Sequence, residues 1–301
     1  MLAYSLVVIL WGYFLRLSES GDGCGTDWPL CNGGALPLGA AFPTWVEFGH
    51  RVSSGLVLVL VSAMAVWAFR VHPQGHLVRR AAGWSLLLTV TESAFGAVLV
   101  VFGLVAEDVS TARIMIRPFH VTNTFLLMAA LGLTAWWAHL GVARAMSLWE
   151  PRHRPVVLAS LAVLTLAWTG SWAGLATTAF PAESFSQGVG QYVDPEHVLI
   201  YLRIFHPAVA IGAVYLLFRL AIAARRSAPD RATSAIASGV SALAVAQLVI
   251  GPLTILLLQP VQLRLLHLFL ADLLWLGVIF LGASMLVEAS SRPVSRGTLA
   301  E

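Results

Sequence analysis

Four histidines in this sequence each have an arginine close by, and the pattern repeats along the chain. Residues three apart share a helix face, so the arginine lies about 4.5 Å from its histidine along the helix axis. Imidazole nitrogens bind haem iron, and a guanidinium group binds a carboxylate through two hydrogen bonds. The pattern therefore predicts histidine ligands for haem iron, with arginines for the haem propionates. The motifs are Arg117-Pro-Phe-His120, Arg203-Ile-Phe-His206, Arg264-Leu-Leu-His267 and His50-Arg51.

The chain that carries these motifs has the composition of a membrane protein. Its 301 residues are 58% hydrophobic and 11% charged, with a mean hydropathy of +0.81, whereas soluble domains have about 25% charged residues. This composition excludes a soluble enzyme, a nucleic-acid-binding protein and a disordered chain. Hydropathy predicts eight transmembrane helices. They cover residues 1–17, 44–69, 81–105, 113–139, 156–178, 199–224, 232–258 and 262–288.

Charged residues predict the orientation of these helices. All 18 basic residues are arginines, and eleven of them lie in the loops after the second, fourth and sixth helices and in the C-terminal tail. By the positive-inside rule, those segments and both termini are cytoplasmic. The opposite loops carry mostly acidic residues, so all four motif histidines lie near the outer face. Five other histidines lie in loops or at helix ends and are predicted to be solvated: His72, His76, His139, His153 and His197.

The spacing of the motif histidines indicates two related halves. His206 and His267 follow His50 and His120 at offsets of 156 and 147 positions. We therefore predict an all-α integral membrane protein with eight transmembrane helices in two pseudo-symmetric four-helix bundles. The first bundle covers residues 1–140 with an outer-loop lid at 18–43, the second covers 156–288, and a cytoplasmic tail covers 289–301. The alternative is that the histidines only make interhelical hydrogen bonds and the arginines extend to headgroups; ionisable residues in membranes favour function.

Three acidic residues lie inside the predicted spans. Glu47 stands three residues before His50, where the other motifs have arginine. A carboxylate does not bind a propionate, so Glu47 is predicted to face the haem edge and to transfer protons. The alternative is an inert ion pair with Arg51. For Glu92 and Asp272 we favour structural pairing over catalysis.

The only two cysteines, Cys24 and Cys31, lie seven positions apart in the outer-loop lid. A disulfide is expected on the oxidising side of the membrane. Two roles for it remain open: a static staple of the lid, or a bond that exchanges in a redox reaction.

Taken together, these motifs resemble those of the haem A synthases, membrane enzymes of cytochrome oxidase assembly. The resemblance rests on Cys24…Asp27-Trp28-Pro29-Leu30-Cys31-Asn32-Gly33, on Glu47-x-x-His50-Arg51 and on single histidines that open the later helices. It covers essentially the whole chain. A second cysteine pair, which some relatives carry between helices five and six, is absent from residues 180–198 here.

The resemblance implies an oxidoreductase that acts on the C8 methyl group of haem O. Successive hydroxylation and loss of water would convert the methyl to the formyl group of haem A. In that family the substrate haem lies in the N-terminal half, and a resident haem b in the C-terminal half relays electrons. The carried-over residues are Glu47 for proton transfer; His50, His120, Arg51 and Arg117 for the substrate haem; His206, His267, Arg203 and Arg264 for haem b; and the Cys24–Cys31 pair.

Two non-enzymatic functions remain open. One is a dihaem electron carrier like a cytochrome b subunit, which would usually hold its haems at different membrane depths. The other is a haem-binding assembly factor. The expected partners are haem O, membrane lipid and the haem O synthase that supplies the substrate, with no nucleic acid. The expected location is the cell membrane; the electron acceptor, the oxygen source and the oligomeric state, a homo-oligomer included, stay open.

Overall fold

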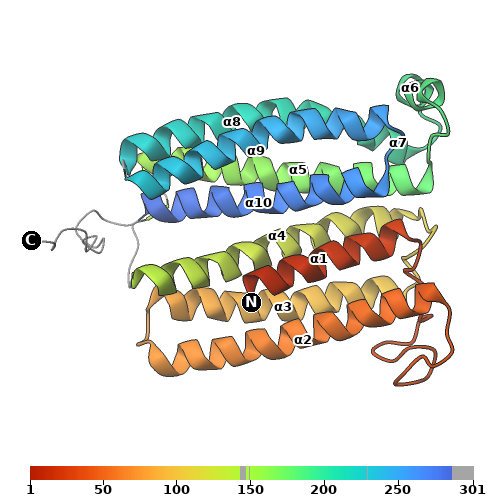
Figure 1. Cartoon of the computed structure of the whole chain (residues 1–301), viewed down its shortest axis with the longest axis horizontal. Helices are drawn as coiled ribbons and strands as arrows, with labels where there is room; N and C mark the ends of the chain where they lie inside the picture. The colour runs from red at the N-terminus through yellow and green to blue at the C-terminus, as the bar shows by residue number, and fades with distance from the viewer. Residues whose placement is uncertain (143–146, 149, 229, 287–301) are drawn as a thin grey trace, which may run out of the picture.

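The computed structural model describes residues 1–142, 147–148, 150–228 and 230–286, and over these residues every regular element is helical (Figure 1). Seven of its segments are long and apolar enough to cross a membrane, which is typical of a multi-pass membrane protein. The helices are α1 (Leu2–Leu17), α2 (Phe42–Val71), α3 (Leu77–Val101), α4 (Thr111–Leu140), α5 (Arg154–Ala179), α6 (Phe185–Val193), α7 (Val198–Arg203), α8 (Phe205–Ser227), α9 (Arg231–Leu256) and α10 (Val261–Met285).

Two of the predicted spans differ in detail from a single long helix. The sixth predicted span consists of α7 and α8, which meet at Ile204 and together cover Val198–Ser227. The first corresponds to α1, an apolar helix of 16 residues that is shorter than the other seven spans. An eighth membrane crossing by α1 therefore stays a prediction.

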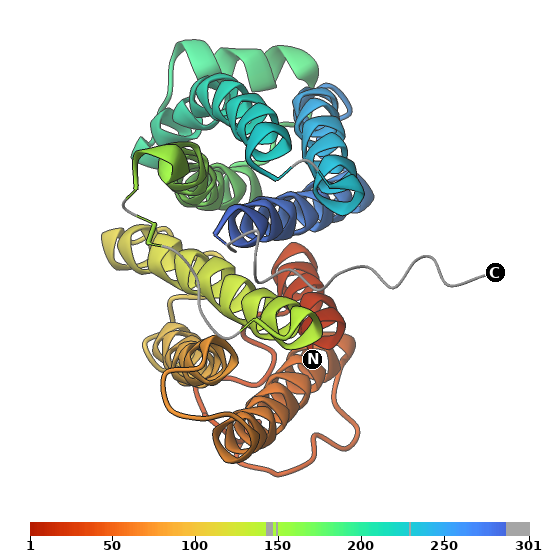
Figure 2. The ribbon, with the colours of Figure 1, turned by 90° about the vertical axis from the view of Figure 1, so that its left-hand side faces the viewer.

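The helices form two groups when the molecule is viewed from its end (Figure 2). Helices α1 to α4 lie in one group, and α5 and α8 to α10 lie in the other. The seam between the groups is packed: Nε1 of Trp275 on α10 donates to the carbonyl of Phe125 on α4 at 2.6 Å. Asp272 is also buried in α10, and its Oδ2 has no hydrogen-bond partner among the described residues. The predicted pseudo-symmetry of the two groups remains untested.

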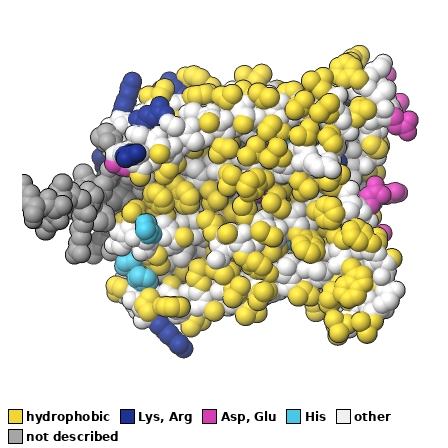
Figure 3. Space-filling model, viewed as in Figure 1, with side chains coloured by type: hydrophobic (Ala, Val, Ile, Leu, Met, Phe, Trp, Pro, Cys, Tyr) yellow, Lys and Arg dark blue, Asp and Glu magenta, His cyan; other side chains and the backbone are white. Residues whose placement is uncertain are grey.

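The surface of the molecule agrees with a membrane environment. Apolar side chains cover the sides of the bundle, and large ones such as Trp67 and Ile211 are more than 70% exposed (Figure 3). Arginines gather at one end and acidic side chains at the other (Figure 3). This is the asymmetry that the positive-inside rule describes. The tail at 289–301 and its Arg292 and Arg296 lie outside the described residues, as does Arg144.

The structure departs from the predicted boundaries at two places. The third span was predicted at 81–105, but α3 covers Leu77–Val101. Nδ1 of His76 accepts a hydrogen bond from the backbone N–H of Val78 and caps the helix start, while Gly103, at φ +64°, turns the chain away at the other end. The short helix α6 was not predicted; it lies in the loop between α5 and α7.

The histidines outside the motifs are not all solvated, in contrast to the prediction. His153 is 1% exposed, and its Nδ1 lies 2.7 Å from the carbonyl of Ser147, so the prediction is wrong there. His197 caps α7 by accepting from the backbone N–H of Leu199. Partial burial, and after it the neighbouring His72, lower the pKa of His76 below its usual value. The lower pKa keeps the imidazole neutral, as a hydrogen-bond acceptor at a helix cap must be.

Candidate functional site

The four motif histidines lie at similar depth, one on each of four helices that start at the same face. His50 is eight residues after the first residue of α2, and His120 is nine after that of α4. His206 is eight residues after the first residue of α7, and His267 is six after that of α10. At 1.5 Å per residue, all four lie about 9 to 14 Å from the helix starts. His206 itself lies on α8, just after the break at Ile204, so the expected common depth agrees with the helix starts but stays a prediction.

The structure brings His206 and His267 together in the second group of helices. Their ring centres are 6.4 Å apart, and the ring planes are at 82° to each other. Two metal–nitrogen bonds of about 2 Å, with about 1 Å from each nitrogen to its ring centre, place such rings about 6 Å apart. Nδ1 of His267 is buried without a hydrogen-bond partner in the described part of the chain. The pair therefore fits two axial ligands of one haem iron.

A hydroxyl group on α5 sets the orientation of one of these rings. Oγ1 of Thr169 donates to the carbonyl of Thr165 at 3.0 Å and lies 3.2 Å from Nδ1 of His206. With its hydrogen on the carbonyl, Oγ1 is placed to accept from Nδ1–H in the tautomer of His206 that carries its proton on Nδ1. The lone pair of Nε2 is then free to bind a metal, as in other sites where a second ligand nitrogen is held by a hydrogen bond.

If His206 ligates the expected haem b, replacement of Thr169 by valine should weaken that binding about 10- to 100-fold, the usual effect of losing such a supporting hydrogen bond. The measurement is the rate at which the purified protein loses haem to an acceptor protein, together with the midpoint potential of the haem. Thr169→Ser keeps the hydroxyl and should behave like the parent. Equal haem loss from the valine and serine variants would show that the hydroxyl does not act on His206.

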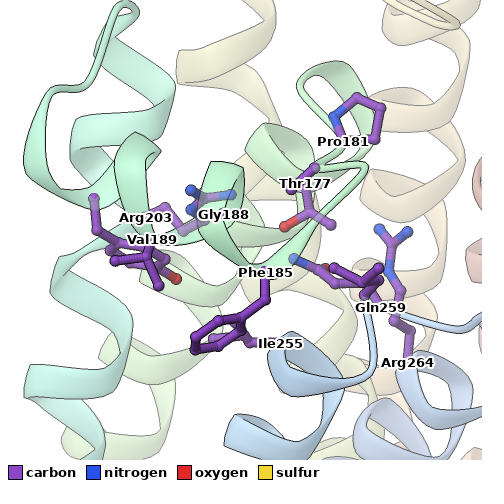
Figure 4. A pocket seen from close by; sticks show the side chains of 12 residues that line it. Thr177, Pro181, Phe185, Gly188, Val189, Arg203, Ile255, Gln259 and Arg264 are labelled. Carbon is purple, nitrogen blue, oxygen red and sulfur yellow. The ribbon is translucent and has the colours of Figure 1, made fainter.

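The predicted propionate arginines of this pair line one cavity beneath α6. Arg203 and Arg264 both border a cavity of about 110 Å³, and Phe185 and Val189 of α6 cover it (Figure 4). Arg203 is 5% exposed and donates to Oε1 of Gln191 at 3.0 Å. Its Nε is buried without a partner in the described residues. A buried guanidinium group with an unused donor fits a carboxylate ligand.

In the first group of helices, His50 lies against a glycine of α1. A Cβ atom added at Gly12 would lie 2.7 Å from Cε1 of His50, so any side chain there would displace the imidazole. The second group repeats this feature, because a Cβ atom at Gly170 of α5 would lie 3.1 Å from Cε1 of His206. These glycines were not identified from the sequence. Their separation of 158 positions, close to the 156 of the two histidines, was the available clue.

His120, the second predicted ligand of that half, lies beside a carboxylate of α3. Nε2 of His120 is 3.6 Å from Oε1 of Glu92. Glu92 also accepts hydrogen bonds of 2.5 Å from Asn123 and from Thr124, both on α4. The expected structural pairing of Glu92 is confirmed, and it positions the turn after His120. Nε of Arg117, one turn before His120, is buried and unpartnered in the described residues, which fits its predicted contact with a propionate.

Glu47 connects the lid to α2. Its side chain is 3% exposed, and Oε1 lies 2.5 Å from Nη2 of Arg51. Its Oε2 accepts a hydrogen bond of 2.8 Å from the backbone N–H of Cys24. Arg51 in turn donates to the carbonyls of Asp27 and Leu30 in the lid. Both residues are thus committed to the lid in this conformation, and their predicted contacts with the substrate haem stay predictions.

The two cysteines of the lid form the expected disulfide. Cys24 and Cys31 are bonded, and both are buried, at 0% and 2% exposure. Oγ1 of Thr44, near the start of α2, donates to the carbonyl of Gly23 at 2.8 Å. The disulfide loop is therefore attached to the first two turns of α2 through the backbone of both Gly23 and Cys24.

Comparison with known proteins gives this site a family. Residues 1–279 match the model of a family described as cytochrome oxidase assembly protein. A heme A synthase of Symbiobacterium thermophilum is 41% identical over 98 residues, 33% of this chain and 32% of that protein. A heme A synthase of Halalkalibacterium halodurans is 36% identical over 98 residues, 33% of each chain.

A longer relative matches almost the whole chain. A protein of Thermus thermophilus named protoheme IX farnesyltransferase is 37% identical over 294 residues, 97% of this chain. The match covers 48% of the Thermus protein, so the chain spans about half the length of that relative. The family match to residues 1–279 and the expected motifs agree. The chain therefore belongs to the haem A synthase family of cytochrome oxidase assembly proteins.

Proposed function

We propose that this chain is a haem A synthase that oxidises the C8 methyl group of haem O to the formyl group of haem A by successive hydroxylation. The observation that carries the proposal is the contrast between its two histidine pairs. His206 and His267 have the separation of two ligands to one iron and no acidic neighbour in their motifs. His50 has a buried carboxylate, Glu47, one turn away. The site of His50, with a proton-transferring group nearby, is therefore suited to the substrate haem. The site of His206 and His267, without such a group, is suited to a resident cofactor.

The C-terminal site would hold haem b, which supplies one-electron redox chemistry when bound. His206 and His267 would ligate its iron, while Arg203 and Arg264 would bind its propionates. Thr169 holds the His206 ring in the orientation that leaves Nε2 free. Helix α6 contributes Phe185 and Val189 to the lining of the cavity of the two arginines.

The N-terminal site would hold haem O between His50 and His120, with Arg51 and Arg117 near its propionates. Glu47 would accept a proton at the reacting methyl group. Because both of its carboxylate oxygens are bonded to Arg51 and to the lid, we expect proton transfer to depend on the position of the lid.

The alternative functions receive less support. A dihaem carrier that moves electrons across the bilayer needs haems at different depths, whereas all four histidines follow six to nine residues after a helix start, which supports a common depth. An assembly factor that only binds haem could use Glu47 to hold the lid but would not need it for proton transfer. For the topology we propose eight spans in two bundles, with both termini cytoplasmic and the sites toward the outer face of the cell membrane; the charge distribution in Figure 3 supports this orientation.

The Thermus relative suggests the partner that supplies the substrate. Its name describes the transfer of a farnesyl group to protohaem IX, and about half of its length lies outside the match to this chain. Two activities joined in one chain would pass haem O directly between their sites. We therefore propose a haem O synthase as the partner of this protein.

The function is tested by pigment analysis of cells that make haem O. Cells with the protein should contain haem A and its hydroxylated precursor, and cells without it should not. Because we propose that a separate haem O synthase supplies the substrate, the purified protein should form no haem O when it is given haem b and farnesyl diphosphate. Bound haem b with haem O left unconverted would instead support the carrier.

The disulfide of the lid is expected to act as a staple, since both cysteines are buried. Cys24→Ser with Cys31→Ser should destabilise the lid by about 2 kcal/mol, the chain-entropy value for so short a loop. The folded protein that remains should still form haem A. Thermal inactivation and haem A yield per folded protein are the measurements. A well-folded variant that keeps haem b but forms almost no haem A would show a redox role.

A further inference from the structure

Arg16, in the last turn of α1, has two buried head-group nitrogens that no described residue uses for a hydrogen bond. Its Nε and Nη2 atoms are buried and make no hydrogen bond within the described residues, and the guanidinium group lies 4.6 Å from the ring centre of Tyr13. An ionised group with unused donors is costly to bury unless an anion or an acceptor completes it. The site is therefore built for a ligand that accepts hydrogen bonds and carries negative charge.

The head group of Arg16 reaches across the seam to α5. A Cβ atom added at Gly174 would lie 3.0 Å from Nη2 of Arg16 and 3.5 Å from Nη1, so the glycine gives the guanidinium group room for this close approach. The same turn of α5 receives Arg264 from α10, whose Nη2 donates to Oγ1 of Thr178 at 3.0 Å and to the carbonyl of Gly174 at 3.5 Å. Two guanidinium groups from different halves of the protein thus meet at one turn of α5.

This arrangement lacks a negative charge. Neither Arg16 nor Arg264 is paired with a carboxylate in the part of the chain that the structure describes. Two like charges in a poorly hydrated site repel each other. An oxyanion bound between the two guanidinium groups would attract both and offset that repulsion. Guanidinium groups bind carboxylates in particular, through paired hydrogen bonds.

We propose that Arg16 and Arg264 form one oxyanion site across the seam, and that it binds a propionate carboxylate of the haem held by His206 and His267. The proposal rests on the proposed function. Arg264 connects the seam with this haem site. It lies one turn before His267 and also lines the cavity beneath α6. The N-terminal half would thus contribute a positioning residue to the C-terminal haem site, and the C-terminal half would not bind its haem independently of the N-terminal half.

The first experiment compares three variants of the full-length protein purified from membranes. Arg16→Gln should lose haem b about 10-fold faster than the parent and shift its midpoint potential, because one of two propionate contacts is gone. Arg16→Lys keeps the positive charge but lacks the paired N–H donors of the guanidinium group. Its rate of haem b loss should therefore lie between those of the parent and Arg16→Gln. The control is Arg219→Gln, which removes an arginine that donates to Tyr215 on the far part of α8. Equal haem loss and potential in Arg16→Gln and the parent would overturn the proposal.

A second experiment identifies the source of the oxyanion. Apoprotein in nanodiscs is reconstituted with haem b or with haem b dimethyl ester, in lipid with or without an anionic headgroup. The parent should prefer the free acid about 10-fold, and Arg16→Gln should lose most of that preference in both lipids. A dependence on anionic lipid, with no preference for the free acid, would show that a headgroup phosphate occupies the site and would overturn the propionate assignment.

A third experiment, with a fourth variant, covers the case in which Arg16→Gln does not fold. Gly174→Leu leaves both arginines in the chain but places side-chain atoms where Nη2 of Arg16 lies. It should reproduce the faster loss of haem b, and parental haem retention would count against the site. A parent protein that binds no haem b would contradict the proposed function instead, so the two failures are distinguishable.

Discussion

His206→Ala and His267→Ala should each reduce the haem b content of the purified protein at least about 10-fold, whereas His50→Ala and His120→Ala should keep it near the parental level. The ring centres of His206 and His267 are 6.4 Å apart, so both would hold one haem iron, and removal of either would take away one of its two protein ligands. The measurement is haem b per mole of protein, from the spectra of extracted pigments.

The control for this experiment is His139→Ala. His139 is an exposed histidine near the end of α4, far along that helix from His120, and its loss should leave both sites intact. The two N-terminal variants should instead lose conversion of haem O. Equal loss of haem b from all four motif variants would contradict the assignment of two separate sites.

Glu47→Gln should bind haem O normally and form haem A at least about 100-fold more slowly, the usual range for loss of a general acid or base. The amide oxygen can still accept the hydrogen bond from the backbone N–H of Cys24, so the lid keeps this attachment to α2. The amide cannot take up a proton. Binding is measured by titration with haem O, and conversion by the appearance of haem A and its hydroxylated precursor.

Two further variants separate chemistry from structure at Glu47. Glu47→Asp keeps a carboxylate and should recover part of the activity. Arg51→Gln breaks the same ion pair but leaves the acid in place, so it should alter the lid and substrate binding more than the rate of oxidation. Parental haem A formation by Glu47→Gln would show that the acid serves only to hold Arg51 and the lid.

The positions of the helices and of the four histidines could be predicted because membranes impose strong local rules. Apolar stretches of about 20 residues mark spans, and ionisable residues within them are rare enough to stand out. These rules located seven spans and the histidine motifs. They could not place the start of α3, because its cap depends on the side chain of His76, and they missed α6, which is too short to be a span.

The polar contacts within the site could not be predicted from the sequence by these rules. Thr169, Gly12 and Gly174 are ordinary residues of apolar helices until a neighbouring helix brings a histidine or an arginine against them. Glu47 and Arg51 were expected to face a haem, yet in this conformation both hold the lid. A buried carboxylate takes the nearest charged partner and backbone N–H available, and which groups are near depends on how residues 18–43 fold back onto α2.

The sequence by itself determined the membrane environment, the expected haem chemistry and the four motif histidines, because hydropathy and helical spacing depend only on neighbours along the chain. The tertiary structure decided which groups meet: His206 with His267, Thr169 with His206, and Arg16 with the turn of α5 that also receives Arg264. Thr169 and His206 are 37 positions apart, and Arg264 and Gly174 are 90 apart. The distances between such residues follow from the packing of whole helices against one another, which no local pattern records.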